Sequence, residues 1–206
     1  MATIVTILTE GYADWEIGLL AGAGRSFYGL KILHAAPGGA PVTSAGGLRV
    51  MPDLAIRAIE LGAVDALVVV GGGIWRSGRA PDISDLLVRA QAQGILVAGI
   101  CDGTRALAQA GLLDHLGHTS NSAENLADTG YAGAAHYRDV PHAVSDSRIV
   151  TAPGTAPVSF FAEVMDGLGL ADGNLEYYLG LLAAEHADRQ ALPTISAEGD
   201  IAYTGR

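Results

Sequence analysis

Cysteine and lysine are almost absent from this chain of 206 residues, which has a single cysteine, Cys101, and a single lysine, Lys31. One cysteine cannot form a disulfide within the chain, so the stability of the fold has to come from its core. The scarcity of basic residues leaves a net charge of −10 at pH 7. Because nucleic acids and anionic membranes attract clustered Lys and Arg, neither is expected as a partner.

Long apolar runs are also missing. The N-terminal run over 4–8 is too short for a signal peptide and lacks its basic flank. No stretch of the sequence approaches the run of about 18 apolar residues that a membrane-spanning helix requires. We therefore expect a cytoplasmic protein. Half of the residues are apolar, which predicts a globular domain with a large core.

Short apolar runs alternate with segments of helical character, which indicates strand-helix-strand units around a parallel sheet. The expected strands lie at 3–8, 31–36, 66–70, 95–100, near 118–121, and in a polar β segment over 138–151. The expected helices lie at 14–28, 53–61, 82–93, 103–110, 123–129, 157–168 and 174–187. We predict one domain over 1–189, followed by a C-terminal arm over 190–206 that has few large apolar residues.

The cysteine follows one of the apolar runs, in the order Gly-Ile-Cys-Asp-Gly. Gly99 and Gly103 allow a strand and a helix to approach closely around a sharp turn, which is the geometry of a nucleophile elbow. A helix N-terminus beside the sulfur predicts a lowered thiol pKa and a nucleophilic thiolate. The alternative is that Cys101 is a small buried apolar residue. The glycines on both sides favour the elbow.

Other candidates follow neighbouring strands, and ligands bind at the carboxyl ends of the strands in such sheets. The backbone amides of Gly72, Gly73 and Asp102 are candidates for binding an oxyanion. Glu16 begins a helix after the first strand, where a carboxylate is favourable against the helix dipole in any case. The topology also places Glu16 at the edge that carries Cys101, where its carboxyl group can hydrogen-bond the sulfur.

The segment over 97–114, with Gly-Ile-Cys-x-Gly followed by Ala-Leu-Ala-x-Ala-Gly-Leu-Leu-Asp, resembles the elbow of the ThiJ/PfpI family. The superfamily of that family includes the parkinsonism-associated deglycase. Segments 65–73 and 148–157 extend the resemblance. It implies a flavodoxin-like three-layer α/β/α sandwich with a mainly parallel sheet, related to the class I glutamine amidotransferase domain. It also implies a homodimer and a glutamate in contact with the cysteine, at Glu16.

Two positions depart from the family pattern. Asp102 follows the cysteine where peptidase-like members have a histidine, and Asn121 stands where many members have one on the next strand. His118 lies three residues earlier and is expected to face away from Asn121 along an extended strand. Without a base of the triad kind, peptide hydrolysis and glutaminase activity are disfavoured. The pattern most resembles the branch labelled glutamine-amidotransferase-like.

We expect a cysteine-dependent reaction on a small carbonyl or amide compound, of glyoxalase, deglycase or amidotransferase-like type. Cys101 is the expected nucleophile, Glu16 its proton partner, and Asn121 part of the pocket. One alternative is a redox-sensing, stress-protective protein that acts through oxidation of Cys101. Another is a catalytically inactive protein that retains the fold. No cofactor is expected, and no metal, because the other histidines lack ligand spacing.

Overall fold

A computed structural model describes residues 1–187 of the chain. It divides into one unit over Met1–Ala171 and a second that begins at Asp172. In the second unit, the Asp172 side chain accepts hydrogen bonds from the backbone of Asn174 and Leu175 at the start of helix α5 (Gly173–Ala187). The predicted boundary at residue 189 and the arm over 190–206 lie outside the described residues. No helix within residues 1–187 has the length and apolar character needed to span a bilayer.

The first unit is built on a seven-stranded sheet in the order β5-β2-β1-β6-β7-β9-β8. Neighbouring strands are parallel except for the pair β8 and β9. The strands are β1 (Thr3–Ile7), β2 (Lys31–Ala36), β5 (Leu54–Ala55), β6 (Ala66–Val69), β7 (Leu96–Ile100), β8 (Val144–Asp146) and β9 (Ile149–Ala152). A separate antiparallel pair is formed by β3 (Val42–Thr43) and β4 (Arg49–Val50).

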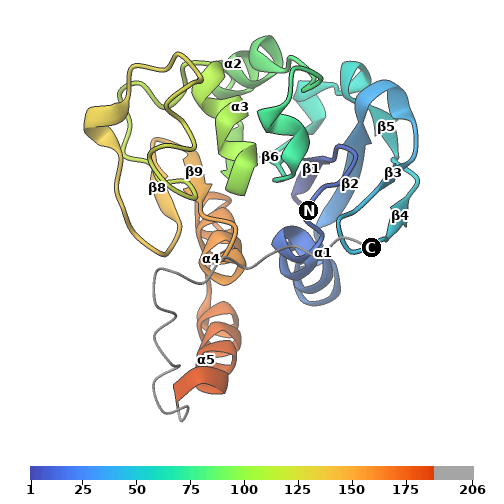
Figure 1. The fold of residues 1–206 in the computed structure, drawn as a ribbon. Helices are drawn as coiled ribbons and strands as arrows, with labels where there is room; N and C mark the ends of the chain where they lie inside the picture. Colours follow the sequence, from blue (N-terminus) through green and yellow to red (C-terminus); the bar gives the residue numbers. More distant parts are fainter. Residues whose placement is uncertain (188–206) are drawn as a thin grey trace. The chain divides into compact units, whose positions relative to one another are not determined.

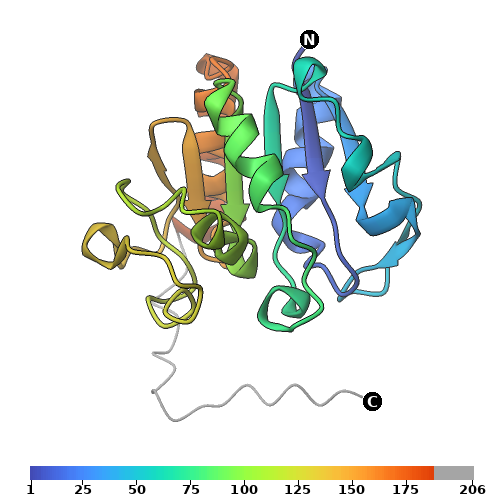
Figure 2. The ribbon, with the colours of Figure 1, turned by 90° about the horizontal axis from the view of Figure 1, so that it is seen from above.

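Helices cover both faces of the large sheet (Figures 1 and 2). Helices α1 (Trp15–Tyr28) and α4 (Pro157–Gly167) lie on one face, and α2 (Ser84–Ala92) and α3 (Thr104–Gln109) lie on the other. Strands β6, β7 and β9 are buried along their whole length, as expected for central strands covered on both sides. The predicted three-layer α/β/α sandwich with a mainly parallel sheet is confirmed.

The helix predicted over 53–61 is wrong. The Asp53 side chain accepts a hydrogen bond from the His34 amide at 2.7 Å, and the Asp53 amide donates to the His34 carbonyl at 2.8 Å. These bonds hold the segment against β2, so it continues as the short edge strand β5. The chain then forms two 3-10 turns, η2 (Ile56–Ala58) and η3 (Leu61–Ala63), in place of a helix.

The strand near 118–121 and the helix over 123–129 are also not formed. His118 makes only an isolated bridge to Tyr137, and the following residues bond through side chains instead of a strand ladder. The Thr119 amide donates to the Thr151 hydroxyl at 2.9 Å, and the Ser120 hydroxyl lies 2.7 Å from that of Thr104. Hydrogen bonds made by short polar side chains compete with the backbone hydrogen bonds of strands and helices, so the segment 118–129 folds as turns.

Candidate active site

Four neighbouring parallel strands, β1, β6, β7 and β9, end at one edge of the sheet, and the residues that follow them meet around Cys101. Glu16 follows β1, Gly71 follows β6, Cys101 follows β7 and Gly154 follows β9. A Cβ atom built on Gly71 would lie 2.6 Å from both the Cys101 Cβ and Glu16 Oε2. One built on Gly154 would lie 2.9 Å from the Cys101 Sγ and 3.0 Å from Glu16 Oε1. Glycine at these two positions therefore makes room for the Cys101 and Glu16 side chains.

The predicted elbow is present in the backbone at Cys101. Its φ of 57° lies in the left-handed region that a residue with a side chain seldom adopts. A Cβ on Gly103 would collide with the carbonyl of Val69, and one on Gly99 would lie 3.2 Å from the Thr104 Cα. The Thr104 hydroxyl donates to the Cys101 carbonyl at 2.6 Å. The two glycines thus permit the close approach, and Thr104 fixes the turn.

Glu16 lies beside the sulfur, as the topology predicts. It is 1% exposed, and its carboxyl oxygens and the Cys101 side chain lie against the same two glycines, so the carboxyl interacts with the thiol. Glu16 Oε2 accepts a hydrogen bond from the Gly71 amide at 2.8 Å, so the first amide of the Gly71–Gly73 loop is used to hold the carboxylate. Burial raises the pKa of Glu16 to about 7, which the bonds to Cys101 and Gly71 only partly offset.

The thiol pKa differs in direction from the sequence prediction. Burial and the negative charge of Glu16 raise the pKa of Cys101 to about 12, although the hydrogen bond from Asn121 lowers it. The short helix α3 that starts at Thr104 does not overcome these two effects. Because the thiol and the carboxyl interact strongly, they titrate as a coupled pair, and the pair loses its first proton near neutral pH.

Asn121 lies beside the sulfur, and both ends of its amide are hydrogen-bonded. Its Nδ2 donates to the Cys101 Sγ at 3.1 Å and to Asp102 Oδ1 at 3.3 Å, while its Oδ1 accepts from the Gly154 amide at 2.9 Å. The buried Asp102 carboxylate forms an ion pair with Arg76 Nε at 2.9 Å. The sequence analysis missed this arginine, because its position depends on the turn that follows the glycine loop.

Of the predicted oxyanion residues, Asp102 directly follows Cys101, and Gly72 and Gly73 follow Gly71 in the loop after β6. Gly72 adopts a φ of 153° and approaches the loop after β1 so closely that a Cβ would lie 2.9 Å from the Gly11 carbonyl oxygen. Gly73 starts the 3-10 turn η4 (Gly73–Arg76), and a Cβ there would meet nothing within 4 Å. It also lines a cavity of about 320 Å³ together with residues of the loop after β1 and of β3. Oxyanion binding by Gly72, Gly73 and Asp102 stays a prediction.

The two tryptophans and His118 differ in where they lie, at the site or in the core. Trp15 is half exposed and donates from Nε1 to the Gly154 carbonyl at 3.2 Å, beside the site. Trp75 is buried and donates to the Val70 carbonyl. His118 is fully buried against the rings of Tyr131 and Tyr137 and lies 2.8 Å through Nδ1 from the Leu116 carbonyl. It therefore does not replace the missing histidine of the site.

Comparison with known proteins identifies the family. The sequence model of the DJ-1/PfpI family matches residues 2–167. The chain belongs to the DJ-1/PfpI family. Among members with solved structures, the DJ-1 superfamily protein Atu0886 of Agrobacterium tumefaciens is 46% identical. That likeness has a TM-score of 0.87 and covers 90% of this chain and 100% of the other.

Two curated relatives have names that describe different activities. The "Uncharacterized protease YoaZ" of Bacillus subtilis is 34% identical over 76% of this chain and 78% of its own length. The "Glutathione-independent glyoxalase DJR-1.2" of Caenorhabditis elegans is 30% identical over 62% of this chain and 68% of its own length. Family membership confirms the resemblance found in the sequence and leaves the reaction to be argued from the site.

Proposed function

We propose that this protein converts a small reactive aldehyde, with Cys101 as nucleophile and Glu16 as the group that carries the proton. The observation that carries the proposal is the close pair of the half-buried Cys101 and the buried Glu16, in which the carboxyl has a pKa of about 7. A general base works best when its pKa lies near the working pH. The raised thiol pKa means that the sulfur gives up its proton to Glu16 as it attacks.

The first step is addition. The sulfur bonds to the aldehyde carbon, Glu16 takes the thiol proton, and the proton passes to the carbonyl oxygen to give a hemithioacetal. For a 2-oxoaldehyde, transfer of hydrogen from C1 to C2 turns this adduct into a thioester. Water then releases a 2-hydroxy acid and the free thiol. One carbon is oxidised while its neighbour is reduced, so the reaction consumes no oxidant.

The alternatives fit the same residues less well. Peptide hydrolysis requires an acid that protonates the departing amine, and the side chain at the family's histidine position is Asn121, which has no acidic proton to give. Oxidation by peroxide is fastest at an ionised, accessible thiol, whereas burial raises the pKa of Cys101. The name of the C. elegans relative agrees with aldehyde conversion.

Proton NMR of methylglyoxal incubated with the protein tests the proposal. Lactate should form with the native chain, and Cys101→Ala and Glu16→Gln should both reduce the rate to that of buffer. Glu60→Gln, which alters an exposed carboxylate far along the chain from the site, is the matched control and should keep the native rate. Lactate formation that survives in Cys101→Ala would refute the mechanism.

Two further points belong to this proposal. We propose a cytoplasmic location, because a lone cysteine that must stay reduced fits a reducing compartment.

We also propose the homodimer that the family resemblance implies. Sedimentation equilibrium should give twice the mass of the chain, and a monomer at all concentrations would refute the dimer.

A further inference from the structure

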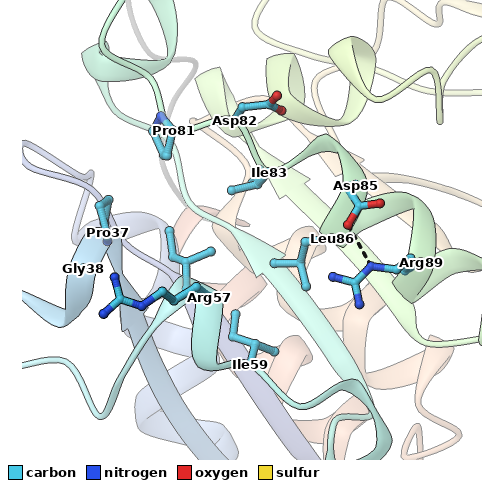
Figure 3. Close-up of a pocket in the computed structure, with 11 residues that line it drawn as sticks. Pro37, Gly38, Arg57, Ile59, Pro81, Asp82, Ile83, Asp85, Leu86 and Arg89 are labelled. Carbon is cyan, nitrogen blue, oxygen red and sulfur yellow. Dashed lines mark hydrogen bonds and ion pairs between the residues drawn. The ribbon is translucent and has the colours of Figure 1, made fainter.

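A cavity of about 340 Å³ lies beside α2, between that helix and the segment where the sequence predicted a helix over 53–61. Residues of the turn η2 line one side of the cavity, and residues at the start of α2 and just before it line the other (Figure 3). The volume falls within the range of small-molecule sites. It is sufficient for a compact organic molecule.

The floor of this cavity is apolar. Ile59 from the turn side and Ile83 and Leu86 from the α2 side are each less than 10% exposed and belong to the hydrophobic core. Figure 3 shows these three side chains lying between two arginines, Arg57 on one wall and Arg89 on the other. An occupant therefore needs an apolar body.

Two arginines and two aspartates line the cavity, and they differ in how they are paired. Arg89 Nε is paired with Asp85 Oδ2 at 2.9 Å, whereas the exposed guanidinium of Arg57 has no hydrogen bond or ion pair with any residue within 1–187. The Asp82 carboxylate points away from both arginines (Figure 3) and accepts a hydrogen bond from the Ser84 amide at 3.0 Å. Arg57 is therefore the cationic group of this lining that has no partner in the described chain and can bind an occupant.

We propose that this cavity binds a small amphipathic anion, with its apolar body over Ile59, Ile83 and Leu86 and its acidic group on Arg57. The site is separate from the Cys101 pair, and none of its residues contributes to the chemistry proposed there. Its occupant is defined by one negative charge and a body of the size of two or three fused or linked rings.

Fluorescence titration with 8-anilinonaphthalene-1-sulfonate tests this site. N-phenyl-1-naphthylamine, which has the same apolar body without the sulfonate, is the uncharged control ligand. We expect saturable binding of one sulfonate per chain. Arg57→Gln should weaken it about tenfold, the size expected for a charged hydrogen bond near the surface. The same variant should leave binding of the uncharged amine unchanged. Arg49→Gln removes an equal charge on β4, outside the cavity, and should change neither.

The substitution is not expected to disturb folding, because Arg57 is exposed and has no partner in the described chain. Equal sulfonate affinity in Arg57→Gln and Arg49→Gln would overturn the proposal, since the dye would then bind elsewhere. Equal weakening of the binding of the sulfonate and of the neutral amine by Arg57→Gln would also overturn it, because the arginine would then not interact with the negative charge.

Discussion

Replacement of Glu16 by glutamine should remove activity and at the same time stabilise the protein at alkaline pH. Glu16 is 1% exposed, and its pKa is about 7 instead of the usual 4.5. A raised carboxyl pKa means that the folded state binds the proton more tightly than the unfolded state. The ionised carboxylate therefore costs stability, and this cost grows from pH 4.5 to pH 7 and stays constant above.

The size of the effect follows from the difference between the two pKa values. It corresponds to about 3 kcal/mol above pH 7, because one pKa unit is worth about 1.4 kcal/mol. Glu16→Gln keeps the shape and the acceptor for the Gly71 amide but carries no charge. At pH 8 it should melt roughly 6–12 °C above the native chain, whereas at pH 4.5 the two should melt together.

Differential scanning calorimetry at pH 4.5 and pH 8, alongside the lactate assay, measures both effects. Glu60→Gln should show neither, because that carboxylate is exposed. A Glu16→Gln chain that melts below the native one at pH 8 would refute the argument, since it would show that the buried charge stabilises the fold. In the native chain, turnover should also fall about tenfold for each pH unit below 7, as Glu16 becomes protonated.

Three further predictions concern the active site and a buried arginine, and two of them have a control substitution. Gly71→Ala should abolish turnover in the lactate assay, because the new methyl group would displace the carboxylate and the sulfur. At Gly22 in α1 a new methyl group would have no atom within 4 Å, so Gly22→Ala should raise the free energy of unfolding in urea by about 0.5–1 kcal/mol. Arg105→Met should lower the free energy of unfolding by about 3 kcal/mol in urea unfolding, because the buried guanidinium bonds two carbonyls and a carboxylate. Arg89→Gln removes only the exposed ion pair with Asp85 and should change it by less than about 1 kcal/mol. Asn121→Asp should slow iodoacetamide labelling of the thiol at pH 8, because a second carboxylate beside the sulfur raises its pKa further.

The parts of the site that could be predicted from the sequence are those that depend on local geometry or on strand order. The elbow is encoded within five residues around Cys101, so Gly99 and Gly103 were sufficient to find it. Glu16 could be placed near the sulfur because parallel strands carry their following loops to one edge. Neither inference needed side-chain detail.

The parts that could not be predicted depend on burial and on contacts between distant segments. The helix dipole suggested a lowered thiol pKa, but the burial of Cys101 and the charge of Glu16 act in the other direction. The ion pair of Arg76 with Asp102 depends on a 3-10 turn that follows the glycine loop. The helix expected over 53–61 failed because Asp53 bonds to the edge of the sheet instead of starting a helix.

Asn121 limits the chemistry that this site can perform. Its NH₂ group donates to the sulfur and its oxygen is occupied by the Gly154 amide, so it can stabilise negative charge on sulfur but cannot accept a proton. Of Asn121 and Glu16, the two side chains beside the sulfur, Glu16 is then the one that can take the thiol proton. A single carboxyl group that takes up this proton and gives it back suits an addition to a carbonyl, in which the same proton moves from sulfur to oxygen.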